Sequence, residues 1–300
     1  MADARKKVAE NAAGEFFVDS TCIDCDTCRE LAPDSFADAG GHSYVRSQPE
    51  TAAARRAALR ALVACPTGSI GIERRSAAPS STKGPRAEIA AAAEEFPLEI
   101  EPGVSYCGFT SPDSFGGSSY LVEHEDGNWL VDSPRWNRGL EARIAARGGL
   151  ARIFLTHRDD VADAARWAAR FGAQRVIHRA DLDAQPDAEI VLEGREPVAL
   201  GREFLAIPVP GHTAGSAALL HRGRFLFTGD HLWWSRNRKR LWASRGVCWH
   251  DWGEQVRSLE RLLEHPFEWI LPGHGDRVRL PAGEMRSALA DLVAALRPSP

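Results

Sequence analysis

The sequence predicts two domains, a small α+β domain at the N-terminus and a larger α/β domain of layered strands and helices. Four of the six cysteines lie within residues 1–75 of the 300-residue chain. Residues 76–85 are rich in Ser, Pro and Gly and show no apolar periodicity, which is typical of a linker. From residue 98 onward, short apolar strands alternate with helical stretches. The predicted parts are residues 1–75, a linker with a short helix at 76–97, and residues 98–300.

Charge and hydropathy exclude two classes of function. The formal net charge is −4, and acidic and basic residues are interspersed, so a strongly basic nucleic-acid surface is not expected. The N-terminus lacks the apolar core of a signal peptide, and no apolar run is long enough to span a membrane. We therefore expect a cytoplasmic protein with neither nucleic acid nor membrane as a partner.

The larger domain is predicted to consist of short strands and three clear helices, with one helix in the first domain and one after the linker. Strands are expected at 119–122, 128–131, 153–156, 175–177, 204–209, 217–221, 224–228 and 269–271. Helices are expected at 53–63, 86–95, 162–171, 252–263 and 281–296.

Four cysteines form a pattern typical of a metal cluster. Cys22, Cys25 and Cys28 are spaced as C-x2-C-x2-C, and Cys65 is followed at once by Pro66. A triple run with a distant fourth thiolate can wrap a cubane cluster, whereas structural zinc sites usually use two separate pairs. A zinc site and free thiols are the alternatives.

The segments CIDCDTC and CPTGSI, which contain these cysteines, resemble single-cluster bacterial-type ferredoxins. The resemblance implies an α+β ferredoxin-like domain. Since all four cysteines are present, it implies a [4Fe-4S] cluster rather than a three-iron one.

A second constellation lies in the larger domain, in the loops that follow apolar strands. Its motifs are THRDDVAD with His157, PGHTAGS with His212, TGDH with Asp230, and LPGHGD with His274. In this order the motifs resemble the metallo-β-lactamase superfamily, over residues 98–280. The resemblance implies an α/β fold, an αββα sandwich, with one or two metal ions at the strand ends. It also implies that His157 and His212 ligate the first metal, His274 the second, and Asp230 both.

The first motif departs from the His-x-His-x-Asp-His pattern of that superfamily. Asp159 stands at the second histidine position, and Val161 and Ala162 stand at the last two. Asp159 can still coordinate a metal. Asp160 or Asp163 can replace the missing ligand, or cap a helix instead, and otherwise the second site is weak or empty. The predicted metal ligands are His157, Asp159, Asp163, His212, Asp230 and His274, and the predicted catalytic residues are Asp159 and Asp230.

These features support three hypotheses for function. Carboxylate in place of imidazole suits iron or manganese better than zinc, although zinc accepts carboxylates too. The leading hypothesis is that a [4Fe-4S] cluster delivers electrons to a mono- or dinuclear non-haem iron site that acts on a small-molecule substrate. It requires an external electron donor, such as a ferredoxin or flavodoxin reductase. The alternative is a dinuclear hydrolase of an ester, thioester or phosphoester, with a structural or sensing cluster. The third is a non-catalytic metal-binding or sensing protein.

Two further groups of residues have predicted structural roles. Asp132, at the end of a predicted strand, is expected to be structural rather than a metal ligand. Five of the tryptophans between Asp230 and His274 form a cluster in the sequence, and we expect them to form an aromatic flap or a domain contact rather than to stack on substrate. They are Trp233, Trp234, Trp242, Trp249 and Trp252.

Overall fold

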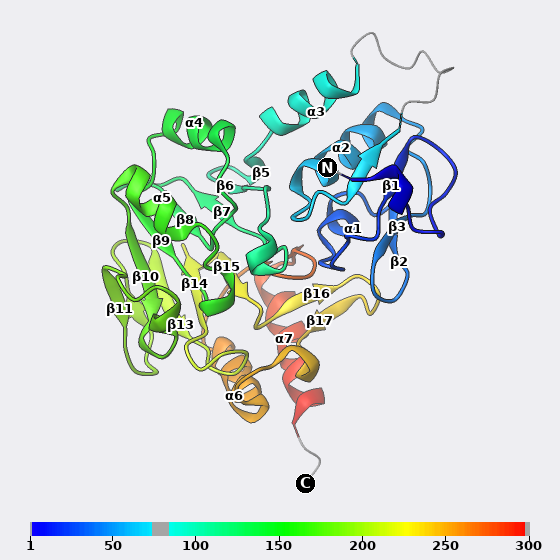
Figure 1. The fold of residues 1–300 in the computed structure, drawn as a ribbon. Helices are drawn as coiled ribbons and strands as arrows, with labels where there is room; N and C mark the ends of the chain where they lie inside the picture. Colours follow the sequence, from blue (N-terminus) through cyan, green and yellow to red (C-terminus); the bar gives the residue numbers. More distant parts are fainter. Residues whose placement is uncertain (1, 74–83, 298–300) are drawn as a thin grey trace. The chain divides into compact units, whose positions relative to one another are not determined.

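The computed structural model describes residues 2–73 and 84–297. Most of the predicted linker therefore lies outside the described residues. Contacts between residues divide the chain into two compact units, and each is described by itself below (Figure 1). The first unit is residues 1–121 with 134–148, and the second is residues 122–133 with 149–300.

The cysteine-bearing part of the first unit consists of two antiparallel strand pairs and two helices. β1 pairs with β4, so that Phe16 lies opposite Ile72 and the two ends of this part meet. α2 begins after Thr51, whose side chain accepts a hydrogen bond from the Ala54 amide at 3.1 Å. The predicted helix at 53–63 is thus confirmed. The elements are β1 (Phe16–Val18), α1 (Thr27–Leu31), β2 (Phe36–Asp38), β3 (Ser43–Val45), α2 (Ala52–Ala64) and β4 (Ile70–Ile72).

The remainder of the first unit holds one predicted and one unpredicted helix. α3 (Pro85–Glu94) confirms the helix expected after the linker. α4 (Arg138–Ala146) was not predicted, because only Leu140 and Ile144 are buried in it. The side chain of Asn137 caps α4 by accepting a hydrogen bond from the Leu140 amide at 3.0 Å. The strands are β5 (Leu98–Glu101), β6 (Val104–Tyr106) and most of β7 (Tyr120–Val122).

In the first sheet of the second unit, four strands run parallel in the order β11-β10-β9-β8. Helix α5 packs against β9 and β10 and buries Ala164, Trp167 and Ala168. It ends at Gly172, which adopts a left-handed conformation with φ 67°. The elements are β8 (Trp129–Val131), β9 (Arg152–Phe154), α5 (Ala164–Phe171), β10 (Gln174–His178) and β11 (Ile190–Leu192).

The second sheet has six strands in the order β12-β13-β14-β15-β18-β19. β14 is antiparallel to both β13 and β15, and β18 is parallel to β15. β13, β15 and β18 therefore run in one direction, and the loops that follow them lie at one edge. The elements are β12 (Val198–Ala199), β13 (Phe204–Pro208), β14 (Ala217–His221), β15 (Phe225–Gly229), α6 (Trp252–Leu262), β18 (Trp269–Pro272), β19 (Val278–Arg279) and α7 (Ala282–Leu296).

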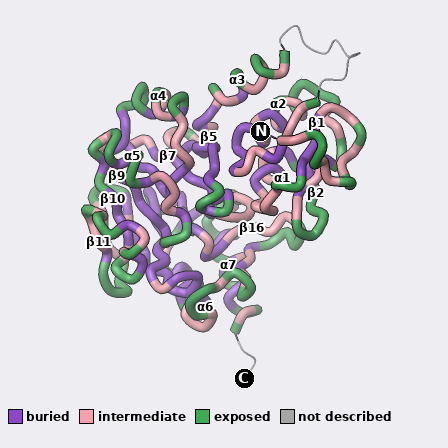
Figure 2. Tube along the Cα trace, viewed as in Figure 1, coloured by how far each residue is buried: buried purple, intermediate pink, exposed green. Residues whose placement is uncertain are grey.

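The two sheets face each other with helices on their outer sides. Trp129 of β8 stacks on Phe204 of β13, with ring centroids 4.1 Å apart. On the other face of the second sheet, Leu226 and Ile270 share a core with Leu259 of α6 and with α7 residues. Figure 2 shows the strands buried and the outer turns of α5 and α6 exposed. This arrangement is the predicted αββα sandwich.

The remaining short elements of the two units are a hairpin and 3-10 helices. Two strands form a separate hairpin between β15 and α6. The hairpin strands are β16 (Trp233–Ser235) and β17 (Arg240–Trp242), and the 3-10 helices are η1 (Ala4–Lys6), η2 (Pro112–Ser114), η3 (Arg158–Asp160), η4 (Arg179–Ala184) and η5 (Arg245–Val247).

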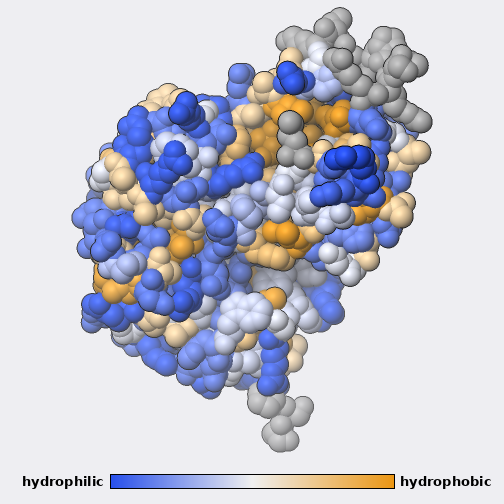
Figure 3. Space-filling model, in the orientation of Figure 1, coloured by the Kyte–Doolittle hydropathy of each residue, from blue (hydrophilic) through white to orange (hydrophobic). Residues whose placement is uncertain are grey.

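The surface agrees with the mixed charges of the sequence. Hydrophilic residues cover most of the face drawn in Figure 3, with smaller hydrophobic patches between them. None of the helices within residues 2–73 and 84–297 is both long enough and apolar enough to cross a membrane.

Gly229 allows the end of β15 to approach the end of β9. It has a φ of 51°, and a Cβ atom there would lie 2.5 Å from Thr156 Oγ1 and 3.2 Å from His157 Nδ1. The first distance is far below van der Waals contact, and the second is tighter than an ordinary contact. The absence of a side chain at residue 229 is therefore a condition for placing Asp230 beside His157.

We expect Gly229→Ala to lower the free energy of unfolding by about 2 to 4 kcal/mol, since overpacking adds to the strain of a positive φ. Urea unfolding of the metal-free chain, followed by tryptophan fluorescence, measures this loss. Gly223→Ala is the matched control, because Gly223 has a φ of 57° but its nearest neighbouring atom would be 3.9 Å away. The control should lose about 1 kcal/mol. Equal losses in the two variants would contradict the close approach.

Candidate functional site

The four predicted cluster cysteines converge within the first unit. Cys22, Cys25, Cys28 and Cys65 form no disulfide, and Cys28 and Cys65 are buried. Burial raises the pKa of Cys25 to about 12, and the charges of Cys65 and Cys22 contribute in the same direction. A thiol whose ionisation burial opposes becomes a thiolate when a metal centre binds it.

The surroundings of these sulfurs form a cradle. The Ser43 amide donates a hydrogen bond to Cys22 Sγ at 3.3 Å, and the Thr27 hydroxyl lies 3.4 Å from Cys25 Sγ. Gly116 approaches so closely that a Cβ atom there would lie 2.8 Å from Cys25 Sγ. Hydrogen bonds to sulfur and exclusion of water are typical of iron–sulfur sites. The cysteine set therefore fits a cluster held by four thiolates.

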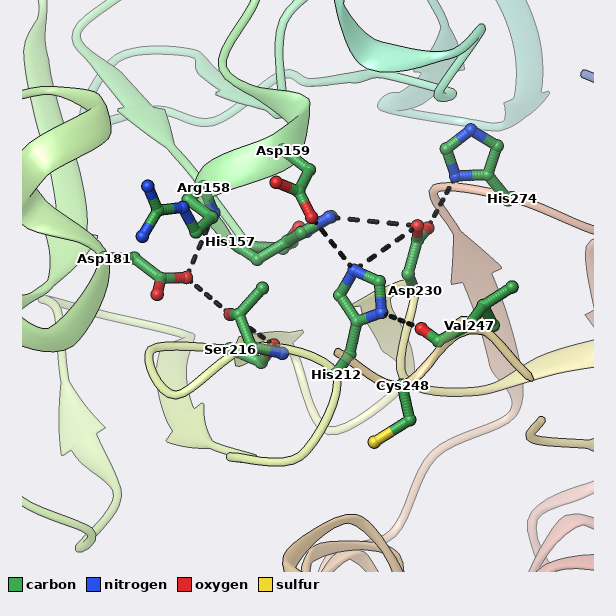
Figure 4. Close-up of polar contacts among 12 residues, drawn as sticks. His157, Arg158, Asp159, Asp181, His212, Ser216, Asp230, Val247, Cys248 and His274 are labelled. Atoms are coloured by element: carbon green, nitrogen blue, oxygen red, sulfur yellow. Dashed lines mark hydrogen bonds and ion pairs between the residues drawn. The ribbon is translucent and has the colours of Figure 1, made fainter. Parts of the chain in front are cut away.

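A first group of candidate ligands lies in the second unit, where His157, His212 and Asp230 come within 4.8 Å of one another. Asp230 Oδ2 lies 3.8 Å from His157 Nε2 and 3.7 Å from His212 Nε2 (Figure 4). Within the described part of the chain, both Nε2 atoms are buried without a hydrogen-bond partner. Unsatisfied buried imidazoles are costly unless they bind a ligand, so this group fits a metal ion.

The other ring nitrogen of each histidine is held by a neighbour. His157 Nδ1 lies 3.0 Å from the Thr156 hydroxyl, which in turn donates to Asp132. His212 Nδ1 donates to the carbonyl oxygen of Val247. These contacts assign the proton to Nδ1 and leave the Nε2 lone pair facing Asp230. Burial also lowers the pKa of His157 to about 4, which keeps the ring neutral. Asp132 thus has the structural role that the sequence predicted.

A second group consists of Asp160, Asp230 and His274. His274 Nδ1 lies 2.7 Å from Asp230 Oδ1, and both Asp160 oxygens are buried without a hydrogen-bond partner among the described residues. Gly273 leaves room here, because its Cβ would lie 2.6 Å from Asp160 Oδ2. Burial, and secondarily repulsion by Asp230, raises the pKa of Asp160. A cation placed here would stabilise both carboxylates, so the second group also fits a metal ion.

Asp230 joins the two groups. Burial alone would raise the pKa of Asp230. The charge of His274 and its hydrogen bond to Asp230, together with the charges of His157 and His212, outweigh burial and lower this pKa. Asp230 is therefore anionic, with Oδ2 toward the first group and Oδ1 toward the second. This is the placement expected of a bridging carboxylate.

The acidic residues after His157 are placed differently from the predicted ligand set. Asp159 Oδ2 lies 3.4 Å from His212 Nε2, but Asp159 belongs to neither group and its side chain is 46% exposed. Asp163 is the N-cap residue of α5 and also lies outside both groups. Asp160 takes the position that the prediction gave to Asp163, because η3 (Arg158–Asp160) turns its side chain inward. In the sequence, the only indication of this role is that Asp160 directly follows Asp159 in the THRDDVAD motif.

Trp249 differs from the other tryptophans between Asp230 and His274. Its side chain is 66% exposed, and its ring centroid lies 6.1 Å from that of His212. The amides of Trp249 and His250 donate to the His212 carbonyl at 2.9 and 3.0 Å, and the Asp251 amide donates to Gly211 at 3.0 Å. These hydrogen bonds hold residues 249–251 beside the first group, and the Trp249 indole is exposed to solvent. Trp233, Trp234, Trp242 and Trp252 are half-buried.

Two family models match the parts of the chain in which these residues lie. The family model described as "4Fe-4S single cluster domain of Ferredoxin I" matches residues 18–72, and that of the "Metallo-beta-lactamase superfamily" matches residues 112–274. The chain is 40% identical over 149 residues to a protein of Anaeromyxobacter dehalogenans named "Hydroxyacylglutathione hydrolase", which covers 48% of this chain and 54% of that protein. It is 33% identical over 177 residues to a protein of the same name from Acidiphilium cryptum, covering 57% of this chain and 70% of that protein.

The chain thus spans about half the length of the first of these relatives. Among solved structures, the DIM-1 metallo-beta-lactamase is similar with a TM-score of 0.48 and 17% identity, covering 66% of this chain and 96% of that one. The superfamily model matches more than half of the chain, and the ferredoxin model matches the four-cysteine region. The chain belongs to the metallo-beta-lactamase superfamily and carries a 4Fe-4S single-cluster domain ahead of its sandwich.

Proposed function

We propose that the second unit hydrolyses thioesters with metal ions bound by the two ligand groups. The observation that carries this proposal is the set of buried, unpartnered ligand atoms on His157, His212 and Asp160, which lie around the shared carboxylate of Asp230. The names of the two relatives support the choice of substrate, since a hydroxyacylglutathione is a thioester.

The donor set limits the metal. Two imidazoles and carboxylate oxygens are ligands that zinc and iron(II) both accept, and manganese is the third candidate. Metal ions bound here would polarise a thioester carbonyl and lower the pKa of a water molecule. The chain's contribution is to hold His157 and His212 in the tautomer that exposes Nε2, and to keep Asp230 charged between the groups.

Asp159 is the candidate catalytic carboxylate. The close approach of His212, whose Nε2 lies 3.4 Å from Asp159 Oδ2, followed by the charges of His157 and His212, lowers the pKa of Asp159 although burial opposes this. It is therefore ionised at neutral pH, and its exposed side chain can accept a proton from an attacking water. Asp230 orients the ligand groups, and Asp159 moves the proton.

Electron delivery from the cluster to the same site is the second candidate function. The observation that favours it is the number of carboxylates at the site, Asp159, Asp160 and Asp230, which suits iron. This candidate also requires an external electron donor such as a ferredoxin or flavodoxin reductase. The relatives' names favour hydrolysis, in which the cluster is structural or sensing.

We expect Asp160→Asn to lose about one metal ion per chain, since the neutral amide removes an anionic ligand from the second group. Metal content after loading, with the cluster iron subtracted by sulfide analysis, measures the loss. Asp163→Asn is the matched control and should keep the wild-type content. Loss in Asp163→Asn with retention in Asp160→Asn would assign the ligand to the position predicted from the sequence instead.

We expect the metal-loaded chain to hydrolyse hydroxyacylglutathione, measured as thiol release. Asp159→Asn should lower kcat by about 10² to 10⁴, the usual contribution of a general base, with metal content unchanged. Asp183→Asn serves as the control, because Asp183 pairs at the surface with Arg158 at 2.7 Å. A fully loaded chain that hydrolyses no thioester would refute the proposed function.

We expect Trp249 to contact the acyl group of the substrate, because its exposed indole is held beside His212. Trp249→Ala should raise KM about tenfold for an aromatic acyl thioester, equivalent to about 1.4 kcal/mol, and leave KM for acetyl thioester nearly unchanged. Trp249→Phe, which keeps an aromatic ring, should have a KM for the aromatic acyl thioester close to that of the wild type. Identical changes for both substrates would show that Trp249 is not a specificity residue.

A further inference from the structure

Arg135 is a half-buried cation without an acidic partner. Its Nη2 donates to the carbonyl of Val63 at 3.0 Å and its Nη1 to the carbonyl of Pro66 at 3.2 Å. Among residues 2–73 and 84–297, no carboxylate forms an ion pair with it. Burying a charge is costly unless an opposite charge lies nearby, so Arg135 calls for an anion.

The two carbonyls that Arg135 binds flank a cluster cysteine. Val63 and Pro66 lie on either side of Cys65 in the sequence, so the guanidinium is fixed at the Cys65 loop. Burial lowers the pKa of Arg135, while the negative charge of Cys65 acts in the opposite direction. The Cys65 thiolate, together with the cluster that it would bind, is therefore the anion that balances the charge of Arg135.

Two neighbouring contacts close the same region to water. Thr110 donates from its amide and its hydroxyl to the Ala64 carbonyl, at 3.2 and 2.7 Å. The Thr27 hydroxyl donates to the Gly116 carbonyl at 3.2 Å, and Gly116 leaves no space beside Cys25. Like Arg135, Thr110 and Gly116 lie beyond the ferredoxin match at residues 18–72. In such a shielded place a single charge acts more strongly than in water.

We propose that Arg135 is the counter-charge of the iron–sulfur cluster and raises its reduction potential. A cluster held by four thiolates is anionic, and one added electron increases its negative charge without forming or breaking a bond. Attraction to the guanidinium stabilises the reduced form more than the oxidised form. The inference concerns the cluster alone and does not depend on thioester hydrolysis.

The test is a redox titration of the full chain after anaerobic reconstitution with iron and sulfide. Dithionite supplies the electron through mediators, and visible absorbance and electron paramagnetic resonance report the reduced fraction. In Arg135→Gln, the ratio of reduced to oxidised cluster at a fixed potential should fall about tenfold, which corresponds to 59 mV for one electron. Arg135→Lys, which keeps the charge, should stay near wild type. Arg138→Gln, at an exposed position three residues away, should not change the ratio.

Other outcomes decide the proposal as well. A wild-type potential in Arg135→Gln, with four irons bound, would overturn it and leave Arg135 a structural role only. If Arg135→Gln cannot hold a cluster, cluster retention by Arg135→Lys supports the counter-charge, because the charge alone restores binding. Loss of the cluster in both variants would overturn it, since the hydrogen-bond geometry and not the charge would then be essential.

Discussion

Asp230 is a mostly buried carboxylate that faces three imidazoles, and the second unit is arranged to place it there. The common direction of β13, β15 and β18 brings His212, Asp230 and His274 to one edge of a sheet. Gly229 and Gly273, on either side of this carboxylate, leave the space that a side chain would fill. The hydrogen bonds that hold the histidines act on Nδ1, so that every Nε2 in the first group remains directed at Asp230.

The sequence predicted the elements whose apolar residues recur regularly, and it singled out His157, His212, Asp230 and His274, which the structure brings into the two candidate ligand groups. Strands and helices such as β14, α6 and α7 lie within a residue or two of their expected bounds. The sequence leaves Asp160 and Asp163 as alternatives, because the 3-10 turn that buries Asp160 has no periodic sequence pattern. The Val247 carbonyl could not be predicted, since a backbone acceptor has no sequence signature and its partner His212 is 35 residues away.

Both sites bring together acidic ligand groups whose charged forms the chain alone does not balance. In the first unit, burial opposes the ionisation of Cys25 and Cys28. In the second, Asp160 and Asp230 are buried close together, and repulsion between them contributes to the raised pKa of Asp160. Binding of cationic metal centres relieves this repulsion, so part of the free energy of metal binding also stabilises the fold. The same imbalance explains why an arginine without a carboxylate partner is tolerated beside Cys65.

The segment that carries Trp249 is tied to the first ligand group by consecutive backbone amides at residues 249, 250 and 251, in addition to the Val247 carbonyl. Bonds of this kind depend on the spacing along the chain and not on the identity of the side chains. Inserting or deleting a single residue would shift every amide out of register and release the ring of His212. Variation in this part of the molecule is therefore restricted to substitutions at a constant loop length, and a new side chain at the exposed position 249 would leave these backbone hydrogen bonds intact.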